Sequence, residues 1–366
     1  IHGGARRMTY EPAPEPECSL EAMFAEMERA PAVYRPSAFW EHFNQLNVDQ
    51  LRRHGVEQFK RTVNQNYFNW LPTDFSDNQL KNVVADWAAQ PDVTPLRVQI
   101  EPAPFLEGFF ESNPLLDPEK RDTYALFVAL LCSFARRHDP QRIIDSLSEP
   151  EAGNPIRVTL DGRPVSQDLA NSVRERNTIL GGTGEHPKAP VIAELGAGYG
   201  RLAYVFLMTT PCKYFIIDIP PALYIAQHYL CSVLPDRRVF RFRHIERFDD
   251  VRDEIESADV CFFTPNQMEL LPRGLVDLFV TISSLHEMRL DQIAHYLDLM
   301  SAMTRRAIYL KQWRVSTNTI DQVTVRREAY RLRPGWTPVF DRADPVQDQF
   351  FEALFRRAPY GPPDRI

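Results

Sequence analysis

The stretch VIAELGAGYGRLAYVF, residues 191–206, decides the fold. A short apolar run leads to Glu194, and glycines follow at three alternate positions, Gly196, Gly198 and Gly200. Strand, glycine-rich turn and helix in this order are typical of the first unit of a doubly wound α/β sheet, whose ligands bind at the carboxyl ends of the strands. Glycine is useful there because it adopts positive φ angles and lets the backbone approach a ligand closely.

Short apolar runs alternate with helical patterns after residue 191. The runs VIAEL, KYFIIDI, DVCFFT, VDLFVTIS and RAIYLKQW are separated by amphipathic stretches such as PPALYIAQHYLCSVL and LDQIAHYLDLMSAMTR. This alternation predicts a Rossmann-like, doubly wound and mostly parallel sheet. The tail WTPVFDRADPVQDQFFEALFRRA is expected to close the sheet with antiparallel C-terminal pairing.

Composition shifts divide the chain into four regions. We expect a disordered segment at 1–18, a mainly helical N-terminal cap region at 19–150, a linker with a hairpin and a helix at 151–190, and a ligand-binding α/β domain at 191–366. The length of 366 residues fits two domains, or one large domain with a cap.

Bulk composition excludes several classes of protein. The net charge of −7 argues against a nucleic-acid partner. The longest apolar stretch, YALFVALLCSF, is too short to span a membrane, so no membrane span is expected. Five scattered cysteines without a C-x-x-C pair predict reduced thiols in a cytoplasmic protein.

A second acidic residue indicates the kind of ligand. The run KYFIIDI ends at Asp218, twenty positions after Gly198, where a carboxylate accepts hydrogen bonds from ribose hydroxyls. The spacing G-x-G-x-G differs from the G-x-G-x-x-G of dinucleotide-binding turns, and Glu194 would repel a pyrophosphate. A carboxylate suits the cationic S-adenosylmethionine, with S-adenosylhomocysteine as product. A nicotinamide dehydrogenase and a purely structural turn remain weaker alternatives.

Several segments contribute candidate cofactor ligands. The loop TPNQMELLP is expected beside the adenine, where Met268 either packs on the ring or is an ordinary buried methionine. The cap segment FKRTVNQNYFNW combines donors with aromatic residues, although its apolar members fit a helix core stripe better. The candidate cofactor-binding residues are Glu194, Gly196, Ala197, Gly198, Gly200, Asp218, Ile219, Asn266, Gln267, Ser283, Arg61 and Tyr67.

The fourth apolar run ends in TISSLHEM, where the methyl group would leave the cofactor. Glu287 and His286 are the candidate catalytic residues, because either can accept a proton from an alcohol. A base from the cap region, or none at all, stays open. A metal is not expected, because no cluster of acidic residues follows this run.

Four further positions are weaker candidates. Lys311 and Trp313 would lie on the rim of the acceptor site, at the end of the fifth apolar run. Gln167 and Asp168 are hydrophilic candidates for folding over the cofactor, whereas Ser166 is expected to cap a helix.

The chain resembles the bacterial sugar O-methyltransferase family over about residues 36–358. The likeness rests on strings such as GVEQFKRTVNQNYFNW, ELGAGYGRLAYVFL, KYFIIDIPPALYIAQHYL, ISSLHEM and PVQDQFFEALFRR. It implies a class I S-adenosylmethionine-dependent methyltransferase domain behind a helical N-terminal region, acting on a sugar hydroxyl. The family pattern is S-S-L-G-E-M, with glycine in place of His286, which makes Glu287 the shared functional candidate.

The expected function is therefore methyl transfer to a hydroxyl of a sugar or sugar-containing metabolite. An N-methyltransferase acting on an amino sugar and a non-catalytic methyltransferase-fold partner subunit remain alternatives. The expected partner is a small sugar or glycoside, and a homodimer stays open.

Overall fold

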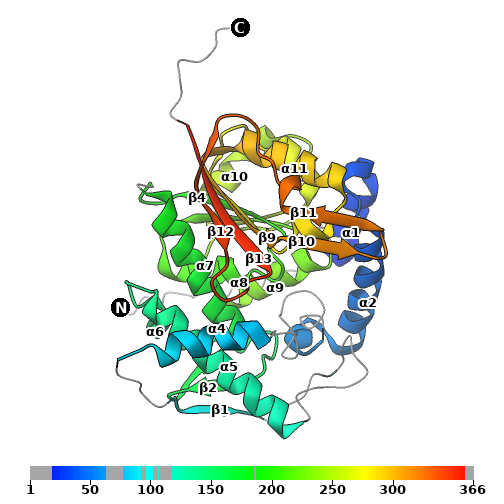
Figure 1. Ribbon diagram of the computed structural model, residues 1–366. Coiled ribbons are helices and arrows are strands. Elements are labelled where there is room, and N and C mark those ends of the chain that lie inside the picture. Colours follow the sequence, from blue (N-terminus) through cyan, green and yellow to red (C-terminus); the bar gives the residue numbers. More distant parts are fainter. Residues whose placement is uncertain are drawn as a thin grey trace, which may run out of the picture.

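The computed structural model describes residues 19–62, 77–91, 96–101, 106, 117–184 and 187–358. Its centre is an eight-stranded sheet in the order β12-β13-β9-β8-β4-β5-β7-β6 (Figure 1). β13 runs antiparallel to β9 and β12, and the other neighbouring pairs are parallel. The predicted Rossmann-like, mostly parallel sheet with antiparallel C-terminal pairing is confirmed. The strands are β4 (Val191–Leu195), β5 (Lys213–Ile217), β6 (Val239–Phe240), β7 (Val260–Phe263), β8 (Val276–Ile282), β9 (Thr304–Trp313), β12 (Trp336–Ala343) and β13 (Phe350–Arg357).

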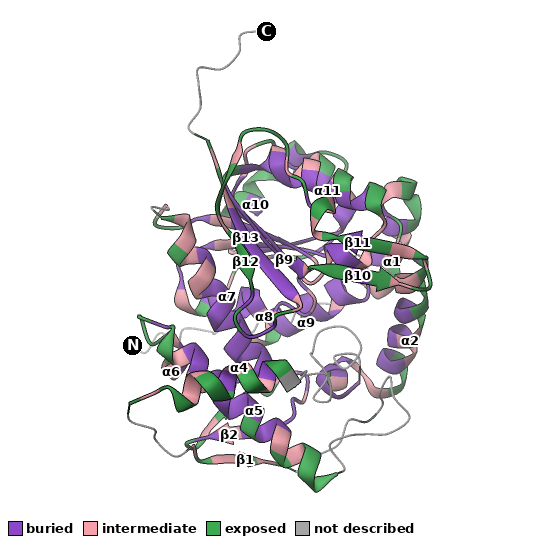
Figure 2. Cartoon of the chain, viewed as in Figure 1, coloured by how far each residue is buried: buried purple, intermediate pink, exposed green. Residues whose placement is uncertain are grey.

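Helices cover both faces of this sheet, as a doubly wound sheet requires. Successive strand residues point to opposite faces, so Tyr214 joins the apolar cluster under α7, α8 and α9, and Phe215 joins the cluster under α10 and α11. The central strands are consequently buried on both sides (Figure 2). These helices are α7 (Gln167–Thr183), α8 (Arg201–Thr209), α9 (Ala222–Val233), α10 (Arg252–Ser257) and α11 (Leu290–Met303).

The N-terminal helices dock in two places. α1 and α2 lie beside α11, whereas α4 and α5 lie below α7 with the small strands β1 to β3 (Figure 1). The elements are α1 (Leu20–Arg29), η2 (Ala32–Tyr34), α2 (Ala38–His54), η3 (Val56–Arg61), α4 (Asp77–Ala88), β1 (Val98–Ile100), α5 (Pro118–Arg137) and α6 (Ile143–Ser146).

The predicted hairpin and helix of the linker are present. β2 (Val158–Leu160) and β3 (Arg163–Val165) pair antiparallel around Asp161 and Gly162, which both have positive φ angles of 50° and 82°. Ser166 caps α7 as expected, because its Oγ accepts a hydrogen bond from the Leu169 amide at 3.0 Å. β1 pairs with β2 and completes a three-stranded sheet.

The remaining elements are a second hairpin and four short 3-10 helices. A second hairpin, β10 (Val315–Asn318) with β11 (Val323–Arg326), follows β9 and reaches toward α1 and α2 (Figure 1). Short 3-10 helices are η5 (Phe248–Asp250), η6 (Pro265–Leu270), η7 (Leu285–Glu287) and η8 (Arg327–Ala329).

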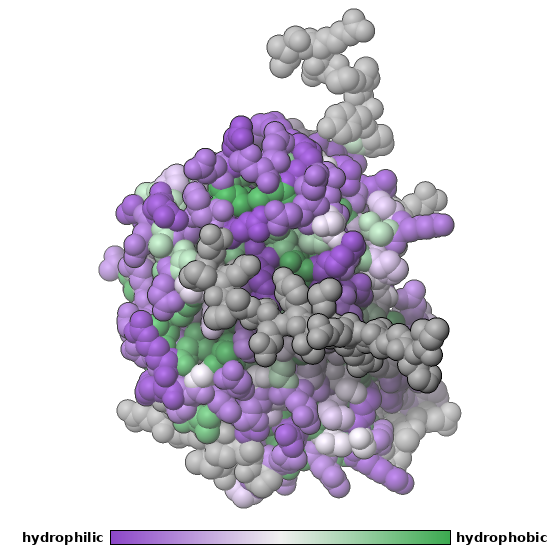
Figure 3. Space-filling view, turned by 180° about the vertical axis from the view of Figure 1, so that it is seen from behind, coloured by the Kyte–Doolittle hydropathy of each residue, from purple (hydrophilic) through white to green (hydrophobic). Residues whose placement is uncertain are grey.

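Among the described residues on the face shown in Figure 3, hydrophilic ones predominate and hydrophobic ones appear in smaller patches. No helix in the described ranges is long and apolar enough to cross a membrane. Among the described residues, Cys132, Cys212, Cys231 and Cys261 are free cysteines. Cys132, Cys212 and Cys261 are buried in the apolar clusters, whereas Cys231 is only partly buried.

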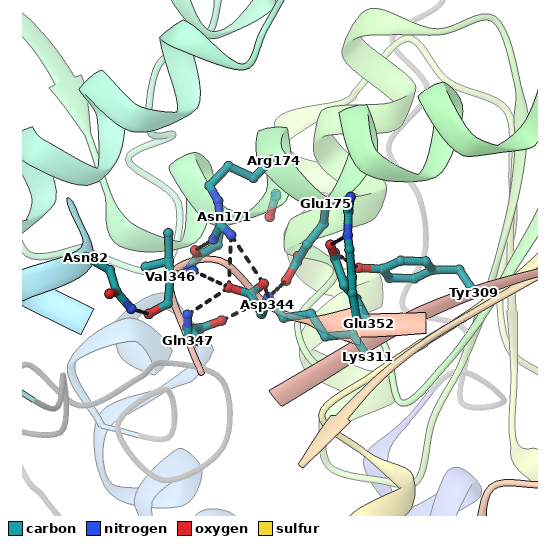
Figure 4. Close-up of polar contacts among 12 residues, drawn as sticks. Asn82, Asn171, Arg174, Glu175, Tyr309, Lys311, Asp344, Val346, Gln347 and Glu352 are labelled. Carbon is teal, nitrogen blue, oxygen red and sulfur yellow. Dashed lines mark hydrogen bonds and ion pairs between the residues drawn. The ribbon is translucent and has the colours of Figure 1, made fainter. Parts of the chain in front are cut away.

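A buried ionic cluster joins the sheet to α7, α8 and the segment between β12 and β13 (Figure 4). The Nζ of Lys311 lies 2.9 Å from carboxylate oxygens of both Glu175 and Asp344. Glu175 also accepts from Arg201 at 2.6 Å, and Asp344 accepts from Arg174 at 3.0 Å. Burial alone would raise the pKa of Asp344, but Arg174 and Lys311 outweigh it and hold this pKa well below its usual range.

We expect Lys311→Met to lower the free energy of unfolding by about 3–5 kcal/mol, because the substitution leaves two buried carboxylates short of a cation. Urea denaturation of the two proteins at neutral pH measures the difference. Arg333→Gln is the matched control: its pair with Asp298 is half exposed and screened by water, so losing it should change the stability little. Equal losses in the two variants would contradict a stabilising role of the cluster.

Candidate functional site

The loop between β4 and α8 needs glycine for two physical reasons. Gly196, Gly198 and Gly200 all have positive φ angles, of 74°, 58° and 87°. A Cβ on Gly196 would lie 2.1 Å from the Oγ of Ser284, and a Cβ on Gly200 would lie 2.8 Å from a methyl group of Leu230. Glycine therefore lets the segment after β8 and helix α9 approach this loop closely.

Asp218 follows β5 directly and faces the glycine loop. Its Oδ2 accepts a hydrogen bond from the Gly198 amide at 2.8 Å, and its Oδ1 accepts one from the Ile219 amide at 2.8 Å. Burial raises the pKa of Asp218 to about 7; the two amides oppose this shift, and the nearby Glu287 adds to it. The carboxyl group thus lies where the sequence predicted, and its pKa is close to neutral pH.

One pocket brings together six of the fourteen predicted site residues, namely Gly196, Gly198, Asp218, Ile219, Ser283 and Glu287. It lies at the carboxyl ends of β4, β5 and β8, where ligands of doubly wound sheets bind. Among the lining residues that the structure describes, Asp218 and Glu287 are the charged ones, and no lysine, arginine or histidine lines the pocket. The lining residues are Leu195, Gly196, Gly198, Asp218, Ile219, Ala222, Pro265, Ser283, Ser284, Glu287, Met288, Gln292 and Tyr296, with Tyr34, Pro36, Ser37 and Trp40 from the N-terminal region.

Glu194 lies beneath the loop and is not among the lining residues. Its Oε2 accepts a hydrogen bond from the hydroxyl of Tyr214 at 2.8 Å, and only 3% of the residue is exposed. Burial raises the pKa of Glu194 to about 8, although Tyr214 and Arg201 oppose the shift. The expected contact of this carboxylate with a cofactor is therefore not what its position favours, because Glu194 lies within β4 and bonds to the neighbouring strand β5. Ala197 and Gly200 likewise belong to the loop without lining the pocket.

The two catalytic candidates have different surroundings. Glu287, at the end of η7, lines the pocket. His286 is 3% exposed, and its ring stacks on Trp313 with the centroids 5.1 Å apart. Its Nδ1 lies 3.1 Å from the Oε1 of Gln312, and its Nε2 lies 3.5 Å from the Oε1 of Glu287. Glu287 consequently reaches the pocket, while His286 lies behind it.

The adenine-side amides are engaged elsewhere, which differs from the expectation for Asn266 and Gln267. Asn266 donates to Glu26 at 2.8 Å. Gln267 accepts from the Thr264 amide at 3.1 Å and donates to the Arg243 carbonyl at 2.8 Å, forming the capping box of η6. The T-x-x-Q spacing is a known capping signal and could have identified this role from the sequence. Met268 is buried in the core, as its alternative interpretation predicted, and Pro265 is the residue of this segment that lines the pocket.

Arg61 also lies away from the pocket. Its guanidinium donates to the carbonyls of Asn154 at 2.8 Å and Pro155 at 2.9 Å, so it ties η3 to the linker. Tyr67, the other cap residue predicted to bind the cofactor, falls outside the described residues. The expectation that Arg61 contacts the cofactor is not supported by its position.

The expected acceptor rim is not formed by Lys311, because this residue is fully buried in the ionic cluster. Trp313 instead packs between His286 and Phe350. Asp168 is buried beneath the loop, where the Tyr199 hydroxyl donates to it at 2.8 Å. Burial raises the pKa of Asp168 to about 7, against the opposing charge of Arg201.

The N-terminal lining residues had no functional signal in the sequence. They belong to the region expected to form a helical cap, and Ser37 caps α2, because its Oγ accepts a hydrogen bond from the Trp40 amide at 3.4 Å. Gln292 and Tyr296 looked like ordinary members of an amphipathic helix. No group of three or more histidine, cysteine, aspartate or glutamate residues in the described ranges is arranged to hold a metal ion.

Comparisons with known proteins add little detail. No protein-family model matches the chain, and no curated protein matches it. The chain is similar to the Burkholderia thailandensis 1,6-didemethyltoxoflavin-N1-methyltransferase, at 15% identity and a TM-score of 0.35, over 74% of this chain and 100% of that chain. It is also similar to an S-adenosylmethionine-dependent methyltransferase from Aquifex aeolicus, at 12% identity and a TM-score of 0.31, over 49% of this chain and 87% of that chain. At such low identities and TM-scores, the site has to be understood from this chain's own residues.

We expect Gly196→Ala to destabilise the protein by about 1–3 kcal/mol, because a positive φ angle strains alanine and the new Cβ meets Ser284. Gly181→Ala is the matched control. Gly181 lies within α7, a Cβ there would contact nothing, and alanine should be neutral or stabilising by about 0.5–1 kcal/mol. Thermal and urea unfolding measure both changes. A Gly196→Ala protein as stable as the control would show that the loop does not need this conformation.

Proposed function

We propose that the chain is an S-adenosylmethionine-dependent methyltransferase that transfers a methyl group to a hydroxyl of a sugar or sugar-containing metabolite. One observation supports this above the others. A single pocket at the carboxyl ends of three parallel strands contains the glycine loop, Asp218 and Glu287. The loop and Asp218 form a nucleoside-binding half, and Glu287 stands on the side where an acceptor would react.

The charges of the pocket favour this cofactor over a nucleotide. Asp218 and Glu287 are both acidic, and no cationic side chain is among the described lining residues. A phosphate group would be repelled there, because it would face carboxylates without a compensating cation. S-adenosylmethionine has no phosphate, and its sulfonium and ammonium groups are positive. When bound, it supplies an electrophilic methyl group on a good leaving group.

The residues that line the pocket fit the nucleoside part of such a cofactor. The Asp218 carboxylate can accept hydrogen bonds from two ribose hydroxyls. Gly196 and Gly198 line the pocket without a side chain, so they present backbone to it. Ile219, Ala222 and Pro265 supply an apolar surface for a flat base.

Glu287 is the residue placed to act on the acceptor. An alcohol oxygen forms its bond to the methyl carbon while losing its proton, and a carboxylate at the pocket wall can accept this proton. His286 lies close to Glu287, at 3.5 Å, and is itself held by Gln312, so it orients Glu287 from behind. The family resemblance supports the sugar class of acceptor and agrees with this division of roles, because the family pattern keeps the glutamate and has glycine at the histidine position.

Calorimetric titration with S-adenosylhomocysteine tests the cofactor. We expect binding by the wild-type chain and a roughly 10–100-fold weaker affinity in Asp218→Ala, because charge-assisted hydrogen bonds contribute about 1.5–3 kcal/mol. Asp298→Ala, which removes an exposed carboxylate from α11, is the control and should bind normally. NADH should not bind.

The same titration has an expected pH dependence. Asp218 has a pKa of about 7 in the free protein, and ribose hydroxyls bind its ionised form better. Affinity should therefore fall as the pH drops below 7, by up to about tenfold per pH unit, and Asp218→Asn should remove this dependence. A folded wild-type protein that fails to bind S-adenosylhomocysteine would contradict the proposed function.

Turnover measurements test the catalytic assignment. Sugars, glycosides and nucleotide-linked sugars are screened for release of S-adenosylhomocysteine, and the best acceptor is used with the variants. We expect Glu287→Gln to lower kcat by about 10²–10⁴-fold, because the positioned proton acceptor is lost, with little change in cofactor affinity. His286→Gln should have a smaller effect. A full rate in Glu287→Gln together with an inactive His286→Gln would assign the base to the histidine.

A further inference from the structure

A segment far from the glycine loop in sequence forms part of the same pocket. Tyr34, Pro36, Ser37 and Trp40 line it together with Asp218 and Ile219. These residues end η2 and begin α2, and we call residues 34–40 the N-terminal strap. Pro36 also lies with Pro220, which follows Ile219, along a neighbouring surface pocket, so the strap runs beside the end of β5.

Gln292 fastens the strap to helix α11. Its side-chain amide donates to the carbonyl oxygens of Val33 and Arg35, both at 2.9 Å. Its Oε1 accepts from the Arg289 amide at 3.3 Å, and the residue is only 3% exposed. Both N–H donors of this buried amide bond to one segment. They fix the position of that segment, because a buried donor without a partner would destabilise the folded protein.

Other contacts hold the strap at both ends. The Tyr34 hydroxyl donates to Glu269 at 2.5 Å and lies 2.7 Å from the Nε2 of His295. The Asp321 carboxylate, in the turn between β10 and β11, accepts from the amides of Ala38 at 2.8 Å and Phe39 at 3.0 Å. An acidic group at the first amides of α2 both satisfies these donors and matches the helix dipole.

The strap is also tied to the reacting side of the pocket. The Oγ of Ser37 donates to the backbone carbonyl of Glu287 at 3.3 Å. The ring of Tyr34 packs edge-on against Tyr296, another lining residue, with the centroids 5.9 Å apart. The strap therefore touches every element that the pocket uses on this side, from η6 to η7 and α11.

We propose that the N-terminal strap is the second wall of the cofactor site, with Gln292 as its positioning residue. The strap holds the nucleoside part of the cofactor against Ile219, Ala222 and Pro265. The side chains that it presents are aromatic, apolar or hydroxyl-bearing and uncharged, which suits a neutral purine nucleoside. This assignment rests on the proposed function, and the experiment separates the two.

Two variants are expected to loosen the strap without altering Ile219, Ala222 or Pro265. Gln292→Leu removes both donors from inside, and Asp321→Ala removes the helix cap from outside the pocket. We expect each to weaken binding of S-adenosylhomocysteine and of adenosine alone by about tenfold, the loss that one or two hydrogen bonds produce. Asp298→Asn, an exposed position on the same helix α11, is the matched control and should bind both ligands normally.

Hydrogen exchange supplies a readout that does not depend on measured affinities. Binding of S-adenosylhomocysteine to the wild-type chain should slow amide exchange across residues 32–43, and Gln292→Leu should speed it in the free protein. Affinity that Asp218→Ala lowers but both strap variants leave intact, or unchanged exchange across 32–43 on binding, would overturn the role of the strap alone. Absence of binding by the folded wild-type chain would overturn the proposed function, and the strap's role with it.

Discussion

The hydrogen bond from the Gly198 amide to the Asp218 carboxylate is the contact on which the site depends. Strands β4 and β5 are parallel neighbours, so their carboxyl ends meet at one edge of the sheet. The amide joins these two ends at 2.8 Å, from a residue with a φ angle of 58° that side-chain-bearing residues rarely adopt. The bond keeps a buried carboxyl facing the pocket, where burial holds its pKa near 7.

Charge is separated around this contact. The pocket holds acidic side chains, whereas cations from the same elements are directed away from it. Arg201, the first residue of α8, and Lys311, near the end of β9, both pair with Glu175 beneath the loop. A cation left at the loop would attract phosphates and repel a sulfonium. The ionic cluster thus stabilises the fold and at the same time leaves the pocket acidic.

Features set by a few neighbouring residues were predictable from the sequence. The glycine loop, Asp218, the hairpin around Asp161 and Gly162, and the Ser166 cap all depend on local backbone conformation. They appear in the structure where the sequence placed them.

Features that depend on distant partners were not predictable in this way. Lys311 lies near the end of an apolar run, and its predicted position on the acceptor rim was inferred from this alone. Its burial is decided by Glu175 and Asp344, which come from other parts of the chain. Arg61 is directed by two carbonyls of the linker in the same manner. For Gln267 the sequence contained a local signal, the T-x-x-Q spacing that predicts a helix cap, but the residue was instead interpreted as a cofactor ligand.

The N-terminal region shows why a helical pattern does not reveal function. Periodicity identifies which face of a helix is apolar, but it does not say which surface that face will cover. η2 docks on α11 and the residues that follow it reach the pocket, η3 docks on α9, and α4 and α5 dock under α7. The change of composition near residue 190 therefore does not separate the pocket from the N-terminal region, because residues from both sides of this boundary line the pocket. The pocket is complete only when residues 34–40 lie across the carboxyl ends of strands that begin more than 150 residues later.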